Sequence, residues 1–312
     1  MSIYYDTFKD RIKNLWNKAI TLDKPLHKDI TWTVGLINGR ADFDDLQAHG
    51  IALAASIIIK ERIVPRIICV WDTYFNTNYF LEHPEKKKEF YPNYLLSCFP
   101  DPGILHNQYR NIPEVFPRTN KYMSLYRHPF SVSPYPYSLG MGYRAKYHGM
   151  EYVTTTYGIM SDIDTICTRP CIEYLESIIN INPDTFCLTN KIGEKWASVG
   201  LCVFNMLKYN MIYKPHWNIM SWETYRADST FIPFLLKKFP ELVDVLDVRV
   251  FDGETINAEK FYKCNPRGNF WNDEKTAHYH AWKGEINVNP KEFIKFYSNI
   301  LTDLENDLER QL

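Results

Sequence analysis

The stretch TWTVGLINGRADFDDLQAHGIALAASIIIKERIVPRIICVWD, residues 31–72, decides the fold that we expect for this chain. Its first part, 31–38, is rich in β-branched residues and ends in an Asn-Gly pair, which is typical of a buried strand. Residues 43–62 predict a helix, and 66–72 predict a second strand. Strand, helix and strand in this order form a βαβ unit, which predicts a parallel sheet with a right-handed crossover.

The carboxyl ends of these predicted strands are where such a sheet binds its ligand. Asn38 and Asp72 occupy the two ends, and Arg40 follows the first strand closely. We therefore interpret Asn38, Arg40 and Asp72 as candidate contacts of a bound nucleotide. The alternative is that GRADFDD, residues 39–45, is only the start of the helix, with an aspartate near its positive end.

The remainder of the chain continues the alternation of strands and helices. Amphipathic helices are expected near both ends, over 5–20 and 289–312. Residues 84–136 hold nine of the 18 prolines and many tyrosines, so we interpret them as an irregular insertion or an ordered lid. No repeat or linker is evident, which predicts one α/β domain over 1–312 with a mixed, mostly parallel sheet flanked by helices. Further strands are expected over 152–162, 184–190, 197–206 and 243–251, and further helices over 138–150, 170–180 and 223–239.

The composition excludes several classes of protein. Of the 312 residues, 45% are hydrophobic, which is enough to bury a sizeable core. The formal net charge of −1 gives no support to a nucleic-acid-binding protein, which usually carries a basic surplus. The longest apolar stretch, 51–59, is too short to span a bilayer, and residues 1–16 lack the apolar core of a signal peptide. Seven scattered cysteines without a CxxC pair indicate reduced thiols, so we expect a soluble, cytoplasmic protein whose membrane association, if any, is peripheral.

The segment GIMSDIDTICTRP, residues 158–170, places two aspartates directly after an apolar run. We expect Asp162 and Asp164 at the end of a strand, where alternation of faces would point both carboxylates the same way and turn Ile163 into the core. Two carboxylates together with phosphate oxygens suit Mg²⁺ or Mn²⁺. The alternative is that one aspartate caps the following helix and the other is solvated.

Two histidines near the C-terminus supply a second candidate for the same chemistry. In KTAHYHAWKG, residues 275–284, His278 and His280 share a strand face and Lys283 follows them. Imidazole is an acceptable third ligand for Mn²⁺. Taken singly, each histidine is more often a surface or hydrogen-bonded residue.

Together these motifs resemble a known family. DID at 162–164, GLCVFNM at 200–206, the acidic helix at 223–239 and HYHAWKG at 278–284 occur in the order found in nucleotide-sugar-dependent glycosyltransferases of the GT-A (Rossmann-like) fold. The resemblance implies a hexosyl- or pentosyltransferase that uses Mn²⁺ or Mg²⁺. It also implies a nucleoside diphosphate sugar as donor, UDP being the commonest nucleotide, and a glycan or other hydroxyl as acceptor.

The resemblance also implies roles for single residues. Asp162 would face the ribose or sugar, and both aspartates would bind the metal, with His278 or His280 as a further ligand. Ala281 stands where the family has glycine, which leaves the choice between the histidines open. Asp228 would be the general base, with Glu223 as its alternative. Further donor contacts would be Arg144, Gly200, Asn205 and, at a phosphate, Lys283.

Two other classes of function remain open from the residues. Paired aspartates at a strand end also occur in metal-dependent nucleotidyltransferases and phosphoesterases, and a structural cation is compatible with a non-catalytic carbohydrate-binding protein. The sequence contains no Walker A loop, GxSxG elbow or HExxH motif, so the P-loop, α/β-hydrolase and zincin classes lose support.

Overall fold

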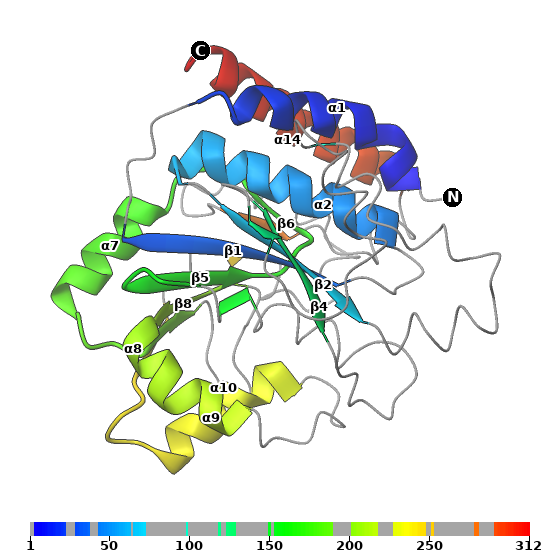
Figure 1. The fold of residues 1–312 in the computed structure, drawn as a ribbon. Helices are drawn as coiled ribbons and strands as arrows, with labels where there is room; N and C mark the ends of the chain where they lie inside the picture. Colours follow the sequence, from blue (N-terminus) through cyan, green and yellow to red (C-terminus); the bar gives the residue numbers. More distant parts are fainter. Residues whose placement is uncertain are drawn as a thin grey trace, which may run out of the picture.

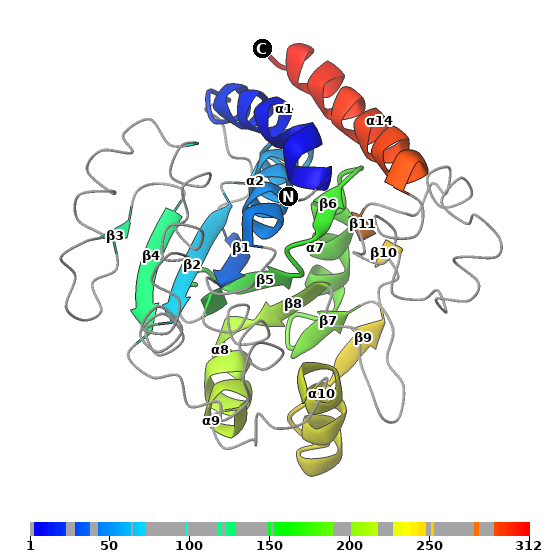
Figure 2. The same cartoon turned by 90° about the vertical axis from the view of Figure 1, so that its right-hand side faces the viewer.

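The computed structural model has an α/β fold in which a large sheet lies between two layers of helices (Figures 1 and 2). Helices α1, α2 and α14 cover one face, and α8, α9 and α10 cover the other. The residues that the structure describes are 3–22, 29–37, 43–63, 65–72, 98, 118–119, 123–128, 149–150, 153–189, 201–217, 227–247, 251–252, 278–280 and 290–312.

The main sheet has eight strands in the order β3-β4-β2-β1-β5-β8-β7-β9. The neighbours β4, β2, β1 and β5 run parallel to one another, as do β7 and β9. β8 is antiparallel to both of its neighbours, and β3 is antiparallel to β4. The strands are β1 Ile30–Ile37, β2 Arg66–Asp72, β3 Arg118–Thr119, β4 Met123–His128, β5 Tyr157–Ser161, β7 Cys187–Thr189, β8 Leu201–Asn205 and β9 Val245–Asp247.

A small second sheet and the helices complete the fold. The second sheet has the order β10-β11-β6, built from Phe251–Asp252, His278–His280 and Thr165–Cys167. The helices are α1 Ile3–Ala19, α2 Phe43–Ser56, the π-helix η1 Ile57–Glu61, α7 Ile172–Ile181, α8 Met206–Lys208, the π-helix η3 Tyr209–Tyr213, α9 Lys214–Trp217, α10 Ala227–Lys238 and α14 Pro290–Glu309. In the part of the chain that the structure describes, no helix has the length and hydropathy needed to cross a membrane.

The two faces of the main sheet pack into separate hydrophobic cores, because side chains alternate along each strand. In β5, Ile159 belongs to the core shared with α1, α2, α7 and α14, whereas Met160 belongs to the core shared with α10. In β8, Val203 and Phe204 divide in the same way. Helices therefore cover both faces, which explains why these strands are nearly continuous apolar runs.

The predicted mixed, mostly parallel sheet flanked by helices is confirmed. The first βαβ unit has the expected parallel pairing of β1 with β2, and the second strand spans 66–72 as predicted. Its helix differs at the end, since α2 stops at Ser56 and continues as η1. Segment 84–136 is not irregular throughout: β3 and β4 lie in it, and β4 extends the sheet beyond β2. Because β4 is short and partly polar, its own sequence does not indicate a strand, and pairing with β2 is what makes the segment a strand.

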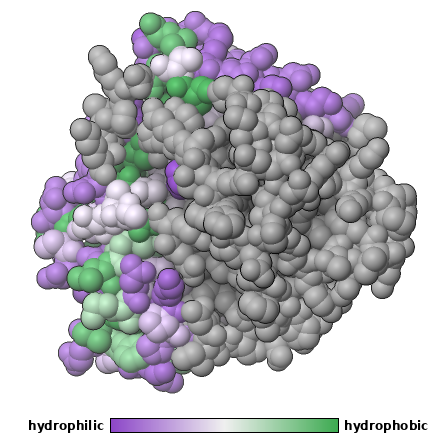
Figure 3. Space-filling model, viewed as in Figure 1, coloured by the Kyte–Doolittle hydropathy of each residue, from purple (hydrophilic) through white to green (hydrophobic). Residues whose placement is uncertain are grey.

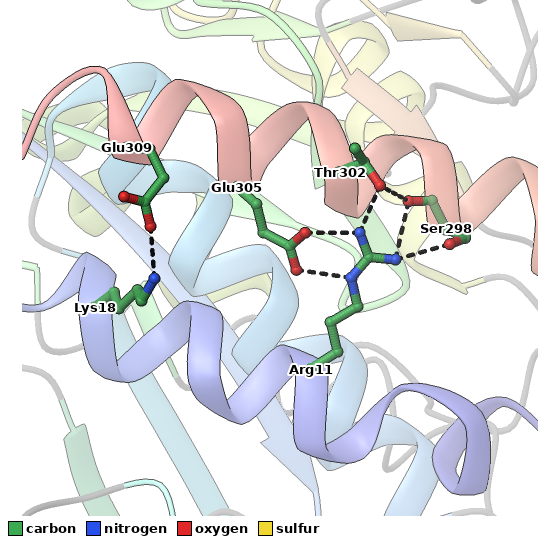
Figure 4. A network of polar contacts seen from close by, with 6 residues as sticks. All are labelled: Arg11, Lys18, Ser298, Thr302, Glu305 and Glu309. Carbon is green, nitrogen blue, oxygen red and sulfur yellow. Dashed lines mark hydrogen bonds and ion pairs between the residues drawn. The ribbon is translucent and has the colours of Figure 1, made fainter.

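The two ends of the chain meet in a pair of helices, α1 and α14 (Figures 1 and 4). Arg11 of α1 donates two parallel hydrogen bonds, each 2.7 Å long, to the Glu305 carboxylate of α14. The same guanidinium donates to the Ser298 carbonyl and hydroxyl and to the Thr302 hydroxyl. A guanidinium fork fits a carboxylate in few orientations, so this network fixes the register of the two helices.

Cys98, Cys167, Cys171, Cys187 and Cys202 are buried, and these five form no disulfide. Burial raises the pKa of the Cys167, Cys171 and Cys187 thiols, and the nearby Glu61 carboxylate raises it further at Cys167 and Cys171. These thiols therefore stay protonated and act as small apolar residues of the core.

Candidate active site

Parallel pairing brings the carboxyl ends of β1, β2 and β5 to one edge of the main sheet, which we call the ligand edge. Ile37 of β1 pairs with Val70 of β2, and Val34 pairs with Ser161, the last residue of β5. Asp72 ends β2, so its backbone lies at the ligand edge, as predicted. This is the edge at which α/β sheets bind their ligands.

Asp162 and Asp164 lie in the connection that leaves this edge, between β5 and β6. The prediction that they are strand residues on one face is wrong, because β5 ends at Ser161 and the chain then turns. The Thr165 hydroxyl donates to the Asp162 carbonyl at 2.6 Å, a local bond of the kind that favours turns over strands. Both aspartates are half-buried, and the isoleucine between them packs against the core as expected.

Buried side chains from β1 and α2 fix the chain on both sides of this turn. Before the turn, the Trp32 indole donates to the Ser161 hydroxyl at 2.9 Å. After it, the Ser56 hydroxyl accepts from the backbone N–H of Cys167 at 2.9 Å. Both serines are buried, so water does not compete for these bonds. The segment that carries the aspartates therefore begins and ends at fixed points.

A buried carboxylate holds the chain just beyond β6. Glu61, the last residue of η1, accepts the backbone N–H groups of Cys171 at 2.8 Å and Ile172 at 3.1 Å. These groups lie at the N-terminus of α7, whose own N-cap residue makes no side-chain cap bond. Glu61 therefore caps α7 from another element and places a negative charge at the positive end of that helix.

The HYH segment, far down the chain, lies beside the segment that follows the aspartates. β11 pairs antiparallel with β6, so that His278 is opposite Cys167 and His280 is opposite Thr165 (Figure 2). Thr165 directly follows Asp164 in the chain. Opposed Cα atoms of an antiparallel pair are about 4.5–5.5 Å apart, so the backbones of His280 and Asp164 are close neighbours. The predicted HYH strand is confirmed, and the two motifs meet in space.

A buried aromatic cluster joins the two terminal helices, and the charge of Asp164 acts on one of its members, Tyr297. The Tyr4 hydroxyl of α1 donates to the Tyr297 hydroxyl of α14 at 2.8 Å, and the Tyr4 ring stacks on His49 of α2. Burial raises the pKa of Tyr297 well above its usual range, and the negative charge of Asp164 raises it further. Tyr297 therefore stays a neutral phenol. The terminal helix pair thus contributes to the surroundings of a predicted metal ligand.

Asn205 lies away from this site, which corrects its predicted role in binding the donor. β8 runs antiparallel to β5, so Leu201 pairs with Ser161 near the ligand edge, whereas Asn205 pairs with Tyr157 at the opposite edge. The two ends of such a strand are about 13 Å apart. The Asn205 side chain accepts from the backbone N–H of Lys208 at 3.2 Å and caps α8. Asparagine is a preferred residue at the start of a helix, so capping explains why it occurs here without any contact with a sugar donor.

The structure gives partial information on the remaining predicted residues. Asp228 is the second residue of α10, in the helix that the sequence predicts for it. α10 packs against the sheet through Phe231, Ile232 and Leu235. The predicted site residues that lie outside the described part of the chain are Asn38, Arg40, Arg144, Gly200, Glu223 and Lys283.

The turn after β5 has the donor atoms that a hard divalent cation prefers. Asp162 and Asp164 are half-buried, and their carboxylate oxygens are of the kind that binds such a cation together with phosphate oxygens. Among the side chains that the structure describes, no three of His, Cys, Asp and Glu come close enough together to hold an ion. A complete site on this turn therefore needs a further ligand, for which His278 and His280 are the predicted source.

Several solved structures of glycosyltransferases are similar to this chain. No family model and no curated protein matches the sequence. Glycosyltransferase GlyE of Streptococcus pneumoniae TIGR4 is 12% identical with a TM-score of 0.44, over 91% of this chain and 62% of that one, so this chain spans less than two thirds of GlyE. Mouse xyloside xylosyltransferase 1 is 10% identical with a TM-score of 0.42, over 82% of this chain and 97% of that one. Mannosyltransferase PcManGT of Pyrobaculum calidifontis, in complex with GDP-Man and Mn²⁺, is 8% identical with a TM-score of 0.36, over 99% of this chain and 84% of that one. These three solved structures, all described as glycosyltransferases, are what the chain is similar to.

Two features of the site were missed by reasoning from the sequence. The strand β6 was not predicted, although Thr165-Ile166-Cys167 is short, apolar and partly β-branched, which is a strand signal. The proximity of Tyr297 to Asp164 was also missed, because Tyr297 belongs to the apolar stripe of α14 and no local pattern distinguishes it.

Proposed function

We propose that this protein is a metal-dependent glycosyltransferase. It moves a sugar from a nucleoside diphosphate sugar, with a UDP-sugar as the preferred donor, to a hydroxyl of a glycan or glycoconjugate. The observation that carries the proposal is the pairing of β11 with β6. It brings the backbone of His280 beside that of Asp164 at the ligand edge, although the two residues are far apart in the sequence. The pairing supports the proposal because it brings residue types that suit a metal and a diphosphate, an aspartate and a histidine, to neighbouring backbone positions.

The proposed roles follow from the chemistry of the leaving group. Bound Mn²⁺ or Mg²⁺ neutralises the negative charge that grows on the diphosphate as it leaves the sugar. Asp162 and Asp164 would bind the ion, with Asp162 also facing the ribose or sugar, and His278 or His280 would complete the ligand set. Lys283 would donate to a phosphate oxygen.

The donor would lie across the ligand edge, beyond the ends of β1 and β2. Asp72 ends β2 at this edge, where α/β sheets bind their ligands. The other proposed donor contacts are Asn38, Arg40, Arg144 and Gly200. Asn205 is not among them, since it caps α8 at the opposite edge.

The test of the proposal is ligand-induced stabilisation of the native protein. A ligand that binds only the folded state raises the melting temperature according to its concentration and affinity. We expect UDP-sugars to raise it with Mn²⁺ present and to have little effect with EDTA, as measured by thermal shift against GDP- and CMP-sugars. Stabilisation by a free sugar without any nucleotide would instead favour a carbohydrate-binding protein. Release of pyrophosphate or phosphate without sugar transfer would favour a nucleotidyltransferase or phosphoesterase.

Asp228→Asn is expected to slow sugar transfer by about 10²-fold, because the proposed general base loses its ability to accept the acceptor proton. The donor-induced thermal shift should stay nearly unchanged, since Asp228 has no proposed contact with the nucleotide. Initial transfer rates and thermal shifts of the same preparation separate the two effects. Glu223→Gln is the companion variant, and a larger loss there would assign the base to Glu223. Equal losses of rate and of donor binding in Asp228→Asn would contradict the assignment.

A further inference from the structure

The outer surface of the layer formed by α8, η3, α9 and α10 exposes large apolar side chains. Figure 3 shows hydrophobic residues gathered with hydrophilic ones over these helices, at the lower left of the molecule. The exposed fractions are 70% for Leu207, 67% for Met211, 43% for Phe234 and 54% for Leu242. Single exposed leucines are ordinary on protein surfaces, but four on one small helical layer are a cluster.

The helices that carry Leu207, Met211 and Phe234 pack side by side, and Leu242 follows α10 in the chain. Tyr213 of η3 contacts Phe231 of α10 with ring centroids 4.6 Å apart. His216 of α9 contacts Phe239, just after α10, at the same separation. These rings therefore pack between the helices of the layer. Leu207 and Met211 are four residues apart and lie on one face of their helix.

Lysines surround the apolar cluster. Lys237 and Lys238 are exposed at the end of α10, and the Lys238 ammonium lies 5.5 Å from the centroid of the Phe234 ring. Lys208 and Lys214, on α8 and α9, are half-buried with their stems along the same layer. The acidic residues described on it are Asp228 of α10 and, after that helix, Glu241 and Asp244, and Asp244 is 3.7 Å from the Lys208 ammonium. Four lysines against three acidic residues give the layer a small basic surplus, with Lys237 and Lys238 adjacent at the end of α10, on a chain whose formal net charge is −1.

We infer that this surface, the α8–α10 face, docks on an anionic lipid surface. Exposed apolar side chains with lysines on the same helices are typical of helices that lie in a membrane interface, where the apolar side chains enter the headgroup region and the ammonium groups contact anionic lipids. A second copy of the chain fits the face less well. A twofold contact would place two lysine-bearing surfaces of the same sign against each other, and like charges repel.

The inference is tested by flotation of the 312-residue protein with lipid vesicles. The protein should float with vesicles of phosphatidylcholine mixed with phosphatidylglycerol and should remain unbound with phosphatidylcholine alone. Added salt should weaken the binding, because it screens the lysines from the anionic headgroups. No flotation with the mixed vesicles at low salt would overturn the inference.

Two double variants locate the binding on this face. K237E/K238E is expected to lower partitioning into the mixed vesicles by about 30-fold or more. L207S/M211S is expected to lower it by about tenfold. The matched controls, K291E/K295E on α14 and L312S at the C-terminus, change exposed residues on another part of the molecule and should leave partitioning unchanged.

Two results would contradict the location or the partner. Equal losses in the control variants would show that overall charge, and not the α8–α10 face, determines binding. A concentration-dependent dimer in sedimentation velocity that L207S/M211S abolishes, without any vesicle binding, would assign the face to a second copy of the chain. All substituted residues are solvent-exposed, so circular dichroism should show unchanged melting for every variant.

Discussion

Asp164→Asn is expected to lower metal-dependent sugar transfer and donor hydrolysis on the order of 10³-fold, a loss of about 4 kcal/mol in the barrier. The side chain keeps its size but loses the charge that would bind the cation, so the charge on the leaving diphosphate is no longer neutralised. Asp164 is half-buried in a turn fixed by Trp32 and Ser56. The fold should therefore survive the substitution, and the loss of activity should be read directly as loss of the metal.

The measurement pairs initial rates with Mn²⁺-dependent thermal shifts in the presence of a UDP-sugar. Both should fall together in Asp164→Asn, whereas circular dichroism should show a native spectrum. Asp184→Asn is the matched control, since Asp184 is an exposed aspartate in the turn after α7 and has no proposed role. Wild-type rates in Asp164→Asn with EDTA present would remove the metal from the proposed mechanism.

Glu61→Ala is expected to lower the free energy of unfolding by about 3–4 kcal/mol. Glu61 is buried, and its two carboxylate oxygens accept the backbone N–H groups of Cys171 and Ile172. Removing them leaves two buried donors unsatisfied, each at a cost of about 1–3 kcal/mol, and leaves the positive end of α7 without its charge partner. The alanine also leaves a space that the surrounding core fills only partly.

Urea unfolding followed by circular dichroism measures this loss. Glu173→Ala is the control, because Glu173 is an exposed carboxylate in the first turn of the same helix and should cost less than about 1 kcal/mol. Similar losses in the two variants would show that the N-terminal charge matters and that the buried hydrogen bonds do not. A stable Glu61→Ala protein that has lost metal binding would mean that Glu61 acts mainly by positioning the aspartate turn.

The elements of the fold were predictable where the signal is local. The strand at 66–72, the N-terminal helix and the C-terminal helix lie where hydrophobic periodicity predicts them. The strand β4 was missed because its segment is rich in proline and tyrosine, and its strand character appears only through pairing with β2. The aspartates were located correctly after β5, but their strand geometry was wrong, since a threonine hydroxyl closes a turn there.

The candidate site was predictable in its chemistry and less so in its geometry. DID and HYH were recognised by residue type and order, and β11 pairs with β6 at the place that unites them. Asn205 was misplaced, because the reversed direction of β8 moves its end to the opposite edge of the sheet. Tyr297, on which the charge of Asp164 acts, is hydrogen-bonded to Tyr4 from the other end of the chain, and no local pattern in either segment predicts this contact.

By itself, the sequence determined the βαβ core, the terminal amphipathic helices and the residue types that suit a cation and a diphosphate, because periodicity and ligand chemistry are properties of neighbouring residues. Only the tertiary structure decided strand direction, the partner of the HYH segment and the side chains that fix the aspartate turn. Strand pairing depends on which strand edges still have unpaired backbone groups once the core has formed. The segments that compete for these edges are far apart in the chain, so no local pattern predicts the outcome.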